Sequence, residues 1–279
     1  MQHTDGPRNG YRAAGDIPQP LAHRIIGDGP RQVLALHCTI GFSGVWRGLA
    51  EQFPDCTFVA PDMLSHGASP DWDREGDFQD RMMEGVLPFL NGRMDVIGHS
   101  FGGLLALRIA AEFPEQVRSL TVVEPVFFAI AAEDAPEVLA EERRMSKPVF
   151  DAFEAGDEPL AARRFNRIWG DADGPRWPDL PERTRQAMVR GIHVVNASGP
   201  AVMDRVGLLQ NDRLAVVDMP ALMLRGAQCE PIVPVINDGL ARRLKHAENV
   251  AIQGAGHMVP ITHPVETATH LRALFDRAQ

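Results

Sequence analysis

A strand, a sharp turn and a helix are predicted over residues 95–103, which read DVIGHSFGG. The segment contains the pattern Gly-x-Ser-x-Gly, directly after an apolar run and directly before the helical pattern of residues 104–111. A serine in such a turn takes a strained backbone conformation, and its neighbours must be small so that strand and helix can approach each other. The turn presents the Ser100 oxygen above the sheet, and the Phe101 amide points to the same place at a helix N-terminus, where an oxyanion is stabilised. The segment therefore indicates a nucleophilic serine.

Short apolar runs alternate with longer amphipathic stretches along much of the chain. Several runs are apolar throughout, which is typical of strands that are covered on both faces of a parallel sheet. The runs lie at residues 33–36, 57–60, 94–97, 120–123, 221–224 and 249–252. This alternation predicts an α/β fold with a mostly parallel, doubly wound sheet.

The alternation stops between Phe127 and Leu214. The stretch has a helix-forming composition, is broken by Gly and Pro at residues 170–175, and contains no convincing strand pattern. We therefore predict a helical insertion over residues 127–214, between the two parts of a sheet domain formed by residues 1–126 and 215–279. An excursion from the carboxyl edge of a parallel sheet overlies the place where such folds bind ligands.

A histidine far along the chain is the predicted partner of Ser100. His257 lies in the segment Gly254-Ala255-Gly256-His257-Met258, a loop of small residues after a predicted strand. A histidine on such a loop can place its imidazole against a serine hydroxyl and take its proton. The pair indicates nucleophilic catalysis by a serine.

Composition and charge exclude several classes of protein. The 279 residues carry a formal net charge of −9, without the basic excess that binding to nucleic acids requires. The three cysteines lack the spacing of a metal site or a disulfide framework. The first 20 residues contain no apolar signal segment, and no apolar run approaches the length of a membrane span. We expect a cytoplasmic protein with neither a nucleic-acid nor a membrane partner, and the oligomeric state stays open.

Four segments together resemble the α/β-hydrolase superfamily, most closely its esterase, haloperoxidase-like and carbon–carbon hydrolase branches. They are GHSFGG, GAGHMVPITHP, PDMLSHGAS at residues 61–69 and LHCTIGFSGVW at residues 36–46. The resemblance implies that residues 127–214 form a cap, that nucleophile, acid and histidine follow in that order, and that no metal or organic cofactor is needed. It also implies that Thr39 supplies a second oxyanion amide, although Cys38 replaces the usual glycine before it.

The acid that orients His257 has two candidates. The resemblance places the acid after the strand that follows the cap, where Glu230 stands in a position more often held by aspartate. Glu124 is the rival, because it lies at the end of the strand before the cap, where related dehalogenases carry their acid. We favour Glu230 and keep Glu124 open.

Apolar and cysteine side chains near the predicted site raise two further points. Aromatic residues cluster around the serine turn and the cap, and an apolar pocket there favours a hydrophobic substrate. The predicted pocket consists of Phe42, Trp46, Phe127, Trp169 and Met258. Cys38 is a weaker alternative nucleophile, since its only evident histidine partner is its neighbour His37.

The sequence thus predicts a serine hydrolase that cleaves a small hydrophobic ester through an acyl-enzyme on Ser100. Two alternatives use the same residues, namely hydrolysis of a carbon–carbon bond in a vinylogous diketone and cofactor-free perhydrolysis. A third is a ligand-binding homologue with negligible turnover, although such a protein has no requirement for both Ser100 and His257. In each case the partner is a small molecule.

Overall fold

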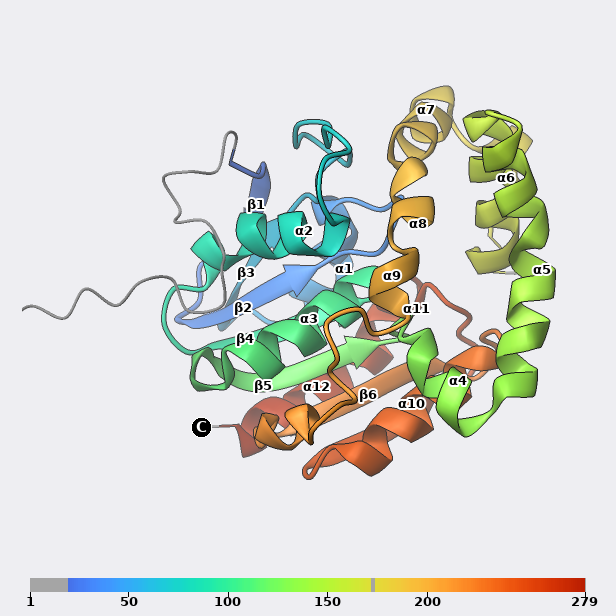
Figure 1. The fold of residues 1–279 in the computed structure, drawn as a ribbon. Coiled ribbons are helices and arrows are strands. Elements are labelled where there is room, and N and C mark those ends of the chain that lie inside the picture. The colour runs from blue at the N-terminus through green and yellow to red at the C-terminus, as the bar shows by residue number, and fades with distance from the viewer. Residues whose placement is uncertain (1–19, 172–173, 279) are drawn as a thin grey trace, which may run out of the picture.

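In the part of the chain that the structure describes, seven strands form a single sheet in the order β1-β3-β2-β4-β5-β6-β7 (Figure 1). The computed structural model describes residues 20–171 and 174–278. Residues 1–19, in which we expect no signal segment, lie outside the described residues. The strands are β1 His23–Ile26, β2 Arg31–Leu36, β3 Cys56–Pro61, β4 Met94–His99, β5 Val117–Val123, β6 Ala221–Gly226 and β7 Ala247–Ile252. β1 runs antiparallel to β3, and the other neighbouring pairs are parallel. The predicted α/β fold with a mostly parallel sheet is confirmed.

Helices cover both faces of the sheet, which explains why the central strands are apolar throughout. One face packs against α2 (Phe78–Val86), α3 (Phe101–Glu112) and α10 (Ile232–Arg243) in a large hydrophobic cluster. A second cluster on the other face joins the sheet to α1 (Arg47–Ala50) and α12 (Pro264–Arg277). The short helix α11 (Val259–Thr262) precedes α12. The strands β4 and β5, whose ends form the site described below, are therefore held from both sides.

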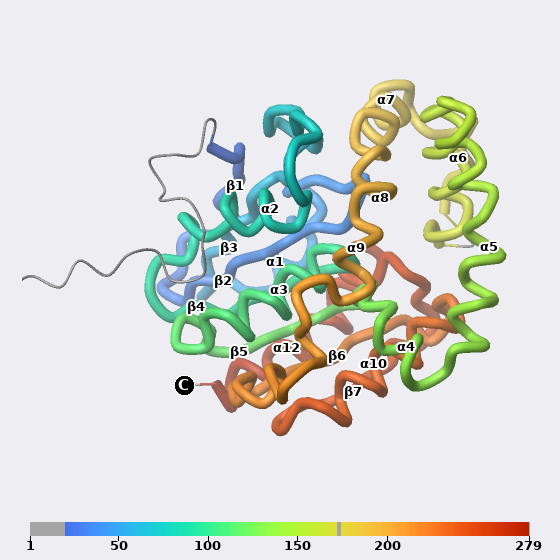
Figure 2. Tube along the Cα trace, viewed as in Figure 1, coloured from blue at the N-terminus to red at the C-terminus, as the bar shows by residue number. Residues whose placement is uncertain are grey.

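Among the described residues, six α-helices lie between β5 and β6, in the stretch for which we predict a helical insertion. They are α4 Phe128–Asp134, α5 Pro136–Glu154, α6 Glu158–Trp169, α7 Glu182–Gly191, α8 His193–Ala197 and α9 Gly199–Val202. The helix α4 stays close to the sheet layer, where Asp134 forms an ion pair with Arg243 of α10. Figures 1 and 2 show α5, α6 and α7 standing away from the sheet, beyond the carboxyl ends of its strands.

A buried carboxylate fixes the amino end of the strand that leads to Ser100. Asp95 on β4 accepts hydrogen bonds from Arg31 Nε at 2.7 Å, Arg118 Nη1 at 3.1 Å and Ser119 Oγ at 2.7 Å. Arg31 lies on β2, and the other two donors lie on β5, so one side chain links three adjacent strands.

No helix in the described residues is long and apolar enough to cross a membrane.

Candidate active site

Ser100 occupies a strained turn between β4 and α3. Its backbone has φ 57° and ψ −118°, in a region that residues with a side chain rarely adopt. The flanking glycines permit the close approach: a Cβ on Gly98 would lie 2.0 Å from the carbonyl oxygen of Gly102, and one on Gly102 would lie 2.3 Å from that of Leu36. The Gly-x-Ser-x-Gly sequence thus forms the sharp strand-to-helix turn in which a serine side chain is presented at the sheet edge.

Two backbone amides near Ser100 are available as hydrogen-bond donors. Phe101 is the first residue of α3, so its N–H has no acceptor within the helix. The Thr39 amide donates to no group among the described residues, whereas the next amide, that of Ile40, donates to His66 Nε2 at 2.9 Å. Ser100 and Thr39 line the same cavities, which are described below.

His257 is paired with Glu124. The distance between His257 Nδ1 and Glu124 Oε2 is 2.6 Å, and both side chains are buried. The second carboxylate oxygen, Oε1, accepts a hydrogen bond of 2.7 Å from the Gly226 amide at the end of β6. Glu124 also has a positive φ of 46°, directly after β5. The structure therefore brings the carboxylate of Glu124 to the imidazole, and not that of Glu230, which the sequence led us to favour.

His99 supports the loop that carries His257. Its Nε2 donates to the carbonyl oxygen of His257 at 2.9 Å, and the two rings lie 4.8 Å apart. Complete burial, with a smaller contribution from His257, lowers the pKa of His99 well below its ordinary value. His99 is therefore a neutral imidazole that donates through Nε2, and it holds the backbone of His257 without adding a charge beside it.

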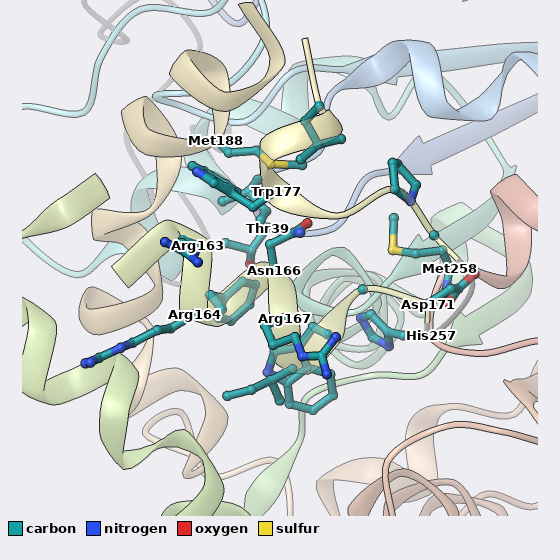
Figure 3. Close-up of a pocket in the computed structure, with 18 of the residues that line it drawn as sticks. Thr39, Arg163, Arg164, Asn166, Arg167, Asp171, Trp177, Met188, His257 and Met258 are labelled. Atoms are coloured by element: carbon teal, nitrogen blue, oxygen red, sulfur yellow. The ribbon is translucent and has the colours of Figure 1, made fainter. Parts of the chain in front are cut away.

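Two cavities meet at Ser100. The large cavity has a volume of about 1140 Å³, and the small cavity one of about 290 Å³. The large cavity is lined by residues 38–41, 163–171 and 174–178 with Ser100, His257 and Met258, and Figure 3 shows several of these side chains. The small cavity is lined by Thr39, Ser100, Phe101, Val126, Phe128, Glu142, Arg143, Ser146, Val149, Phe150, Phe165, Trp169, Val195, Ser198, Gly199, Val202 and Met203. His257 faces the large cavity and is not part of the wall of the small one.

Residues of the predicted insertion touch the histidine loop directly. The Trp169 ring lies 5.0 Å from the His257 ring, and Asp171 Oδ1 accepts a hydrogen bond of 3.0 Å from the Met258 amide. Arg163, Arg164, Arg167 and Arg176 also line the large cavity. The wall opposite the sheet edge therefore combines four guanidinium groups with a mainly apolar surface.

The sequence comparison decides the family. A family model described as the alpha/beta hydrolase fold matches residues 32–264. The chain belongs to the α/β-hydrolase family. This α/β hydrolase is 28 % identical to "Lipase LipV" of Mycobacterium tuberculosis over 253 residues, which cover 88 % of this chain and 93 % of the relative. It is also 28 % identical to "Pimeloyl-[acyl-carrier protein] methyl ester esterase" of Nitrosomonas europaea, over 89 % of this chain and 96 % of the relative.

Solved structures agree with this family. An esterase from Thermogutta terrifontis superposes with a TM-score of 0.69 at 20 % identity, covering 92 % of this chain and 93 % of that chain. The enol-lactonase from Burkholderia xenovorans gives a TM-score of 0.71 at 16 % identity, over 92 % and 96 % of the two chains. These structures show the α/β-hydrolase fold, and the two relatives found by sequence are named a lipase and an esterase.

Only part of the predicted pocket lies at the cavities of the hydrolase. Trp169 lines both cavities, and Met258 lines the large one. Trp46 and Phe127 line neither, because each is fully buried in one of the two hydrophobic clusters against the sheet. Phe42 lines neither cavity and is 45 % exposed.

Several lining residues were missed by the sequence reasoning. Glu142 and Ser146 line the small cavity from α5, although the buried face of that helix is otherwise formed by apolar residues. A polar pair at buried helix positions was the sequence signal that could have identified them, because buried polar side chains need a partner.

The cysteines near the site are not poised for nucleophilic chemistry. Cys38 lines the large cavity, but burial raises the pKa of its thiol to about 12. The ring of His37 is engaged elsewhere, with Nδ1 near the carbonyl oxygen of Cys38 and Nε2 accepting from the Met63 amide at 2.9 Å. Burial likewise raises the pKa of Cys229 to about 12.

Among the described residues, no three His, Cys, Asp or Glu side chains are grouped so that they could hold a metal ion.

Proposed function

We propose that the chain is a serine ester hydrolase in which Ser100 is the nucleophile, His257 the general base and Glu124 the acid that orients His257. The observation that carries this proposal is the 2.6 Å contact between Glu124 and His257, beside a cavity that also exposes the strained Ser100. The proposed oxyanion donors are the amides of Phe101 and Thr39. The names of the lipase and esterase relatives support ester chemistry.

The hydrogen bonds of Glu124 explain how the imidazole is prepared for this role. Because Gly226 N–H holds Oε1, the other oxygen faces His257 and accepts the proton of Nδ1. The tautomer with a proton on Nδ1 leaves Nε2 free to accept the proton of Ser100. Within the described residues, Ser100 Oγ and His257 are not yet hydrogen-bonded, as is common before a substrate is bound.

The proposed reaction has two halves. Ser100 Oγ attacks the ester carbonyl carbon as its proton moves to His257 Nε2, and the two amides stabilise the negative oxygen of the tetrahedral intermediate. Collapse breaks the bond to the alcohol, which leaves with the proton from His257. Water then attacks the acyl-enzyme by the same path, which releases the acid and restores Ser100.

The position of His257 assigns the two sides of the ester to the two cavities. His257 must protonate the leaving alcohol, so the alcohol lies on the side of the large cavity, which His257 lines. The acyl group then enters the small cavity of about 290 Å³. The preferred substrate is therefore an ester of a short acyl group and a larger alcohol, and residues 127–214 act as the cap that forms most of both walls.

Hydrolysis of nitrophenyl esters tests the proposal. Wild type is expected to cleave short acyl esters and to react with a fluorophosphonate probe, and both activities are expected to be lost in Ser100→Ala. Ser43→Ala is a matched control, because Ser43 is a buried serine that lines neither cavity. A wild-type protein that cleaves no ester in the panel and resists the probe, or a Ser100→Ala variant that retains activity, contradicts the proposal.

A further inference from the structure

The buried face of α5 carries two polar residues at positions where an apolar side chain is expected. The buried residues of this helix are Leu139, Glu142, Ser146, Val149 and Ala152. Glu142 and Ser146 are each only 6 % exposed, and both line the small cavity together with Ser100. A carboxyl group is therefore buried in the wall of the cavity that receives the acyl group under the proposed function.

The contacts of Glu142 leave it incompletely satisfied. Ser146 Oγ donates to Glu142 Oε1 at 2.5 Å, and no described residue donates to Oε2. No cation among the described residues forms an ion pair with the carboxyl; the adjacent Arg143 is exposed and extends to Met203 Sδ. Burial raises the pKa of the Glu142 carboxyl above its ordinary value. Burial of a carboxyl without a full set of partners costs several kcal/mol or is relieved by a ligand.

The rest of the small cavity supplies little hydrogen bonding beyond the oxyanion region. Its wall is mainly apolar, with Val126, Phe128, Val195, Val202 and Met203 among the lining residues. Ser198 also lines it, but its hydroxyl donates to the Val194 carbonyl oxygen at 2.7 Å. Arg143 lines it too, but its Nη2 is directed at Met203 Sδ. Glu142 Oε2 is therefore the buried polar atom of this wall that is best able to bind a polar substituent.

We propose that Glu142, supported by Ser146, selects esters whose short acyl chain carries a hydroxyl group. This inference rests on the proposed function, because it assumes that the acyl chain enters the small cavity. A hydroxyl both donates and accepts, so it satisfies the carboxyl in its neutral and in its ionised form. An ammonium group would bring a second charge into a mainly apolar wall, and a carboxylate would meet the carboxyl of Glu142, with which Arg143 forms no ion pair.

The expected preference follows from the hydrogen bond that a plain acyl chain leaves unmade. A site built to bind a hydroxyl discriminates against the analogue that lacks it, because a buried polar group is then left without a partner. We expect wild type to prefer a hydroxyacyl ester over the matched alkanoyl ester by roughly tenfold or more in kcat/KM. This preference can be measured without any substitution.

The experiment compares 4-nitrophenyl butanoate and hexanoate with the 3-hydroxybutanoate, 3-hydroxyhexanoate and 6-hydroxyhexanoate esters. The preference is the ratio of kcat/KM for a hydroxyacyl ester to that for the matched plain ester. In Glu142→Met the largest of these ratios is expected to fall by about tenfold, while the plain esters are cleaved as well as before or better. Glu142→Gln retains hydrogen bonding and is expected to keep part of the preference. Glu137→Met is the matched control, because Glu137 is an exposed residue of the same helix, and it is expected to leave the preference unchanged.

Three outcomes overturn the inference. One is a wild type that cleaves plain and hydroxyacyl esters equally at every hydroxyl position, and this result stands even if the variants fail to fold. Another is a folded Glu142→Met variant whose preference is unchanged. This includes a variant that loses activity equally on all the esters, which is the result expected if Glu142 has only a structural role. If wild type cleaves none of the esters and resists the fluorophosphonate probe, the proposed function fails as well, which distinguishes that result from the first two.

Discussion

Replacing Glu124 by glutamine tests the proposed triad most directly, since the change keeps the shape of the side chain and removes its charge. The glutamine can adopt two orientations. If its oxygen faces Gly226, its NH₂ group faces His257 Nδ1 and favours the tautomer with the proton on Nε2, which cannot accept the proton of Ser100. If its oxygen faces His257, its NH₂ group meets the Gly226 amide, and two donors oppose each other at the 2.7 Å separation that Glu124 shows.

Both orientations lead to a large loss of rate. The first orientation holds His257 in the wrong tautomer and the second opposes two buried donors, each at a cost of about 1–3 kcal/mol. Both also lose the charge-assisted hydrogen bond that stabilises the imidazolium, at about 1.5–3 kcal/mol. The sum of about 2.5–6 kcal/mol corresponds to a loss of roughly 10²–10⁴ in kcat. The same substitution at Glu230 changes neither contact, so its kcat is expected to stay within about threefold of wild type.

Steady-state kinetics on a short nitrophenyl ester distinguish these outcomes, with thermal unfolding of each variant as the control for folding. Glu124→Gln is expected to keep a cooperative transition while its kcat falls. A Glu230→Gln variant that loses more activity than Glu124→Gln would refute the assignment of Glu124, and so would a Glu124→Gln variant with nearly full activity.

Three further predictions concern the cysteines, acid stability and the core. Iodoacetamide at neutral pH is expected to leave esterase activity intact, because burial raises the pKa of Cys38 and Cys229 to about 12; rapid inactivation would contradict this. Burial lowers the pKa of His66 to about 3 in the folded state, against about 6.5 in the unfolded state. As the pH falls below 6.5, the unfolded state therefore takes up a proton before the folded state does. The free energy of unfolding is expected to be about 2 kcal/mol lower at pH 5 than above pH 6.5. His66→Gln is expected to flatten that decline in Tm, and an unchanged slope would argue against it. Asp95→Ala is expected to lower the free energy of urea unfolding by about 2–4 kcal/mol, since it removes the buried carboxylate that Arg31, Arg118 and Ser119 share; a loss below about 1 kcal/mol would contradict the role of Asp95.

The sheet and the serine turn were predictable because their signals are local. The turn at Ser100 needs small neighbours, and the buried strands need apolar runs, so the positions of both follow from short windows of sequence. The choice between Glu124 and Glu230 has no such signal. Each follows a strand that ends at the same sheet edge, and only the three-dimensional structure shows which carboxylate reaches His257.

Pocket residues were harder to predict for the same reason. Trp46 belongs to a segment close in sequence to Thr39, yet the short 3-10 helix Ser43–Trp46 turns its ring into the cluster with α12. Proximity along the chain to an active-site loop therefore does not show whether a side chain faces the substrate or the core. Glu142 illustrates the converse, because it lies far from Ser100 in sequence and shares a cavity with it.

The strand order explains why a carboxylate after β5 suits the proposed role of triad acid. β5 lies between β4, which carries Ser100, and β6, which ends at Gly226. A Cβ on Gly226 would lie 2.3 Å from the carbonyl oxygen of Gly256, so the end of β6 packs directly against the histidine loop. Glu124 therefore accepts a hydrogen bond from β6 through one oxygen and binds His257 through the other. Because the sheet itself fixes the carboxylate, the imidazole is oriented before any substrate arrives, which is the preorganisation that general-base catalysis requires.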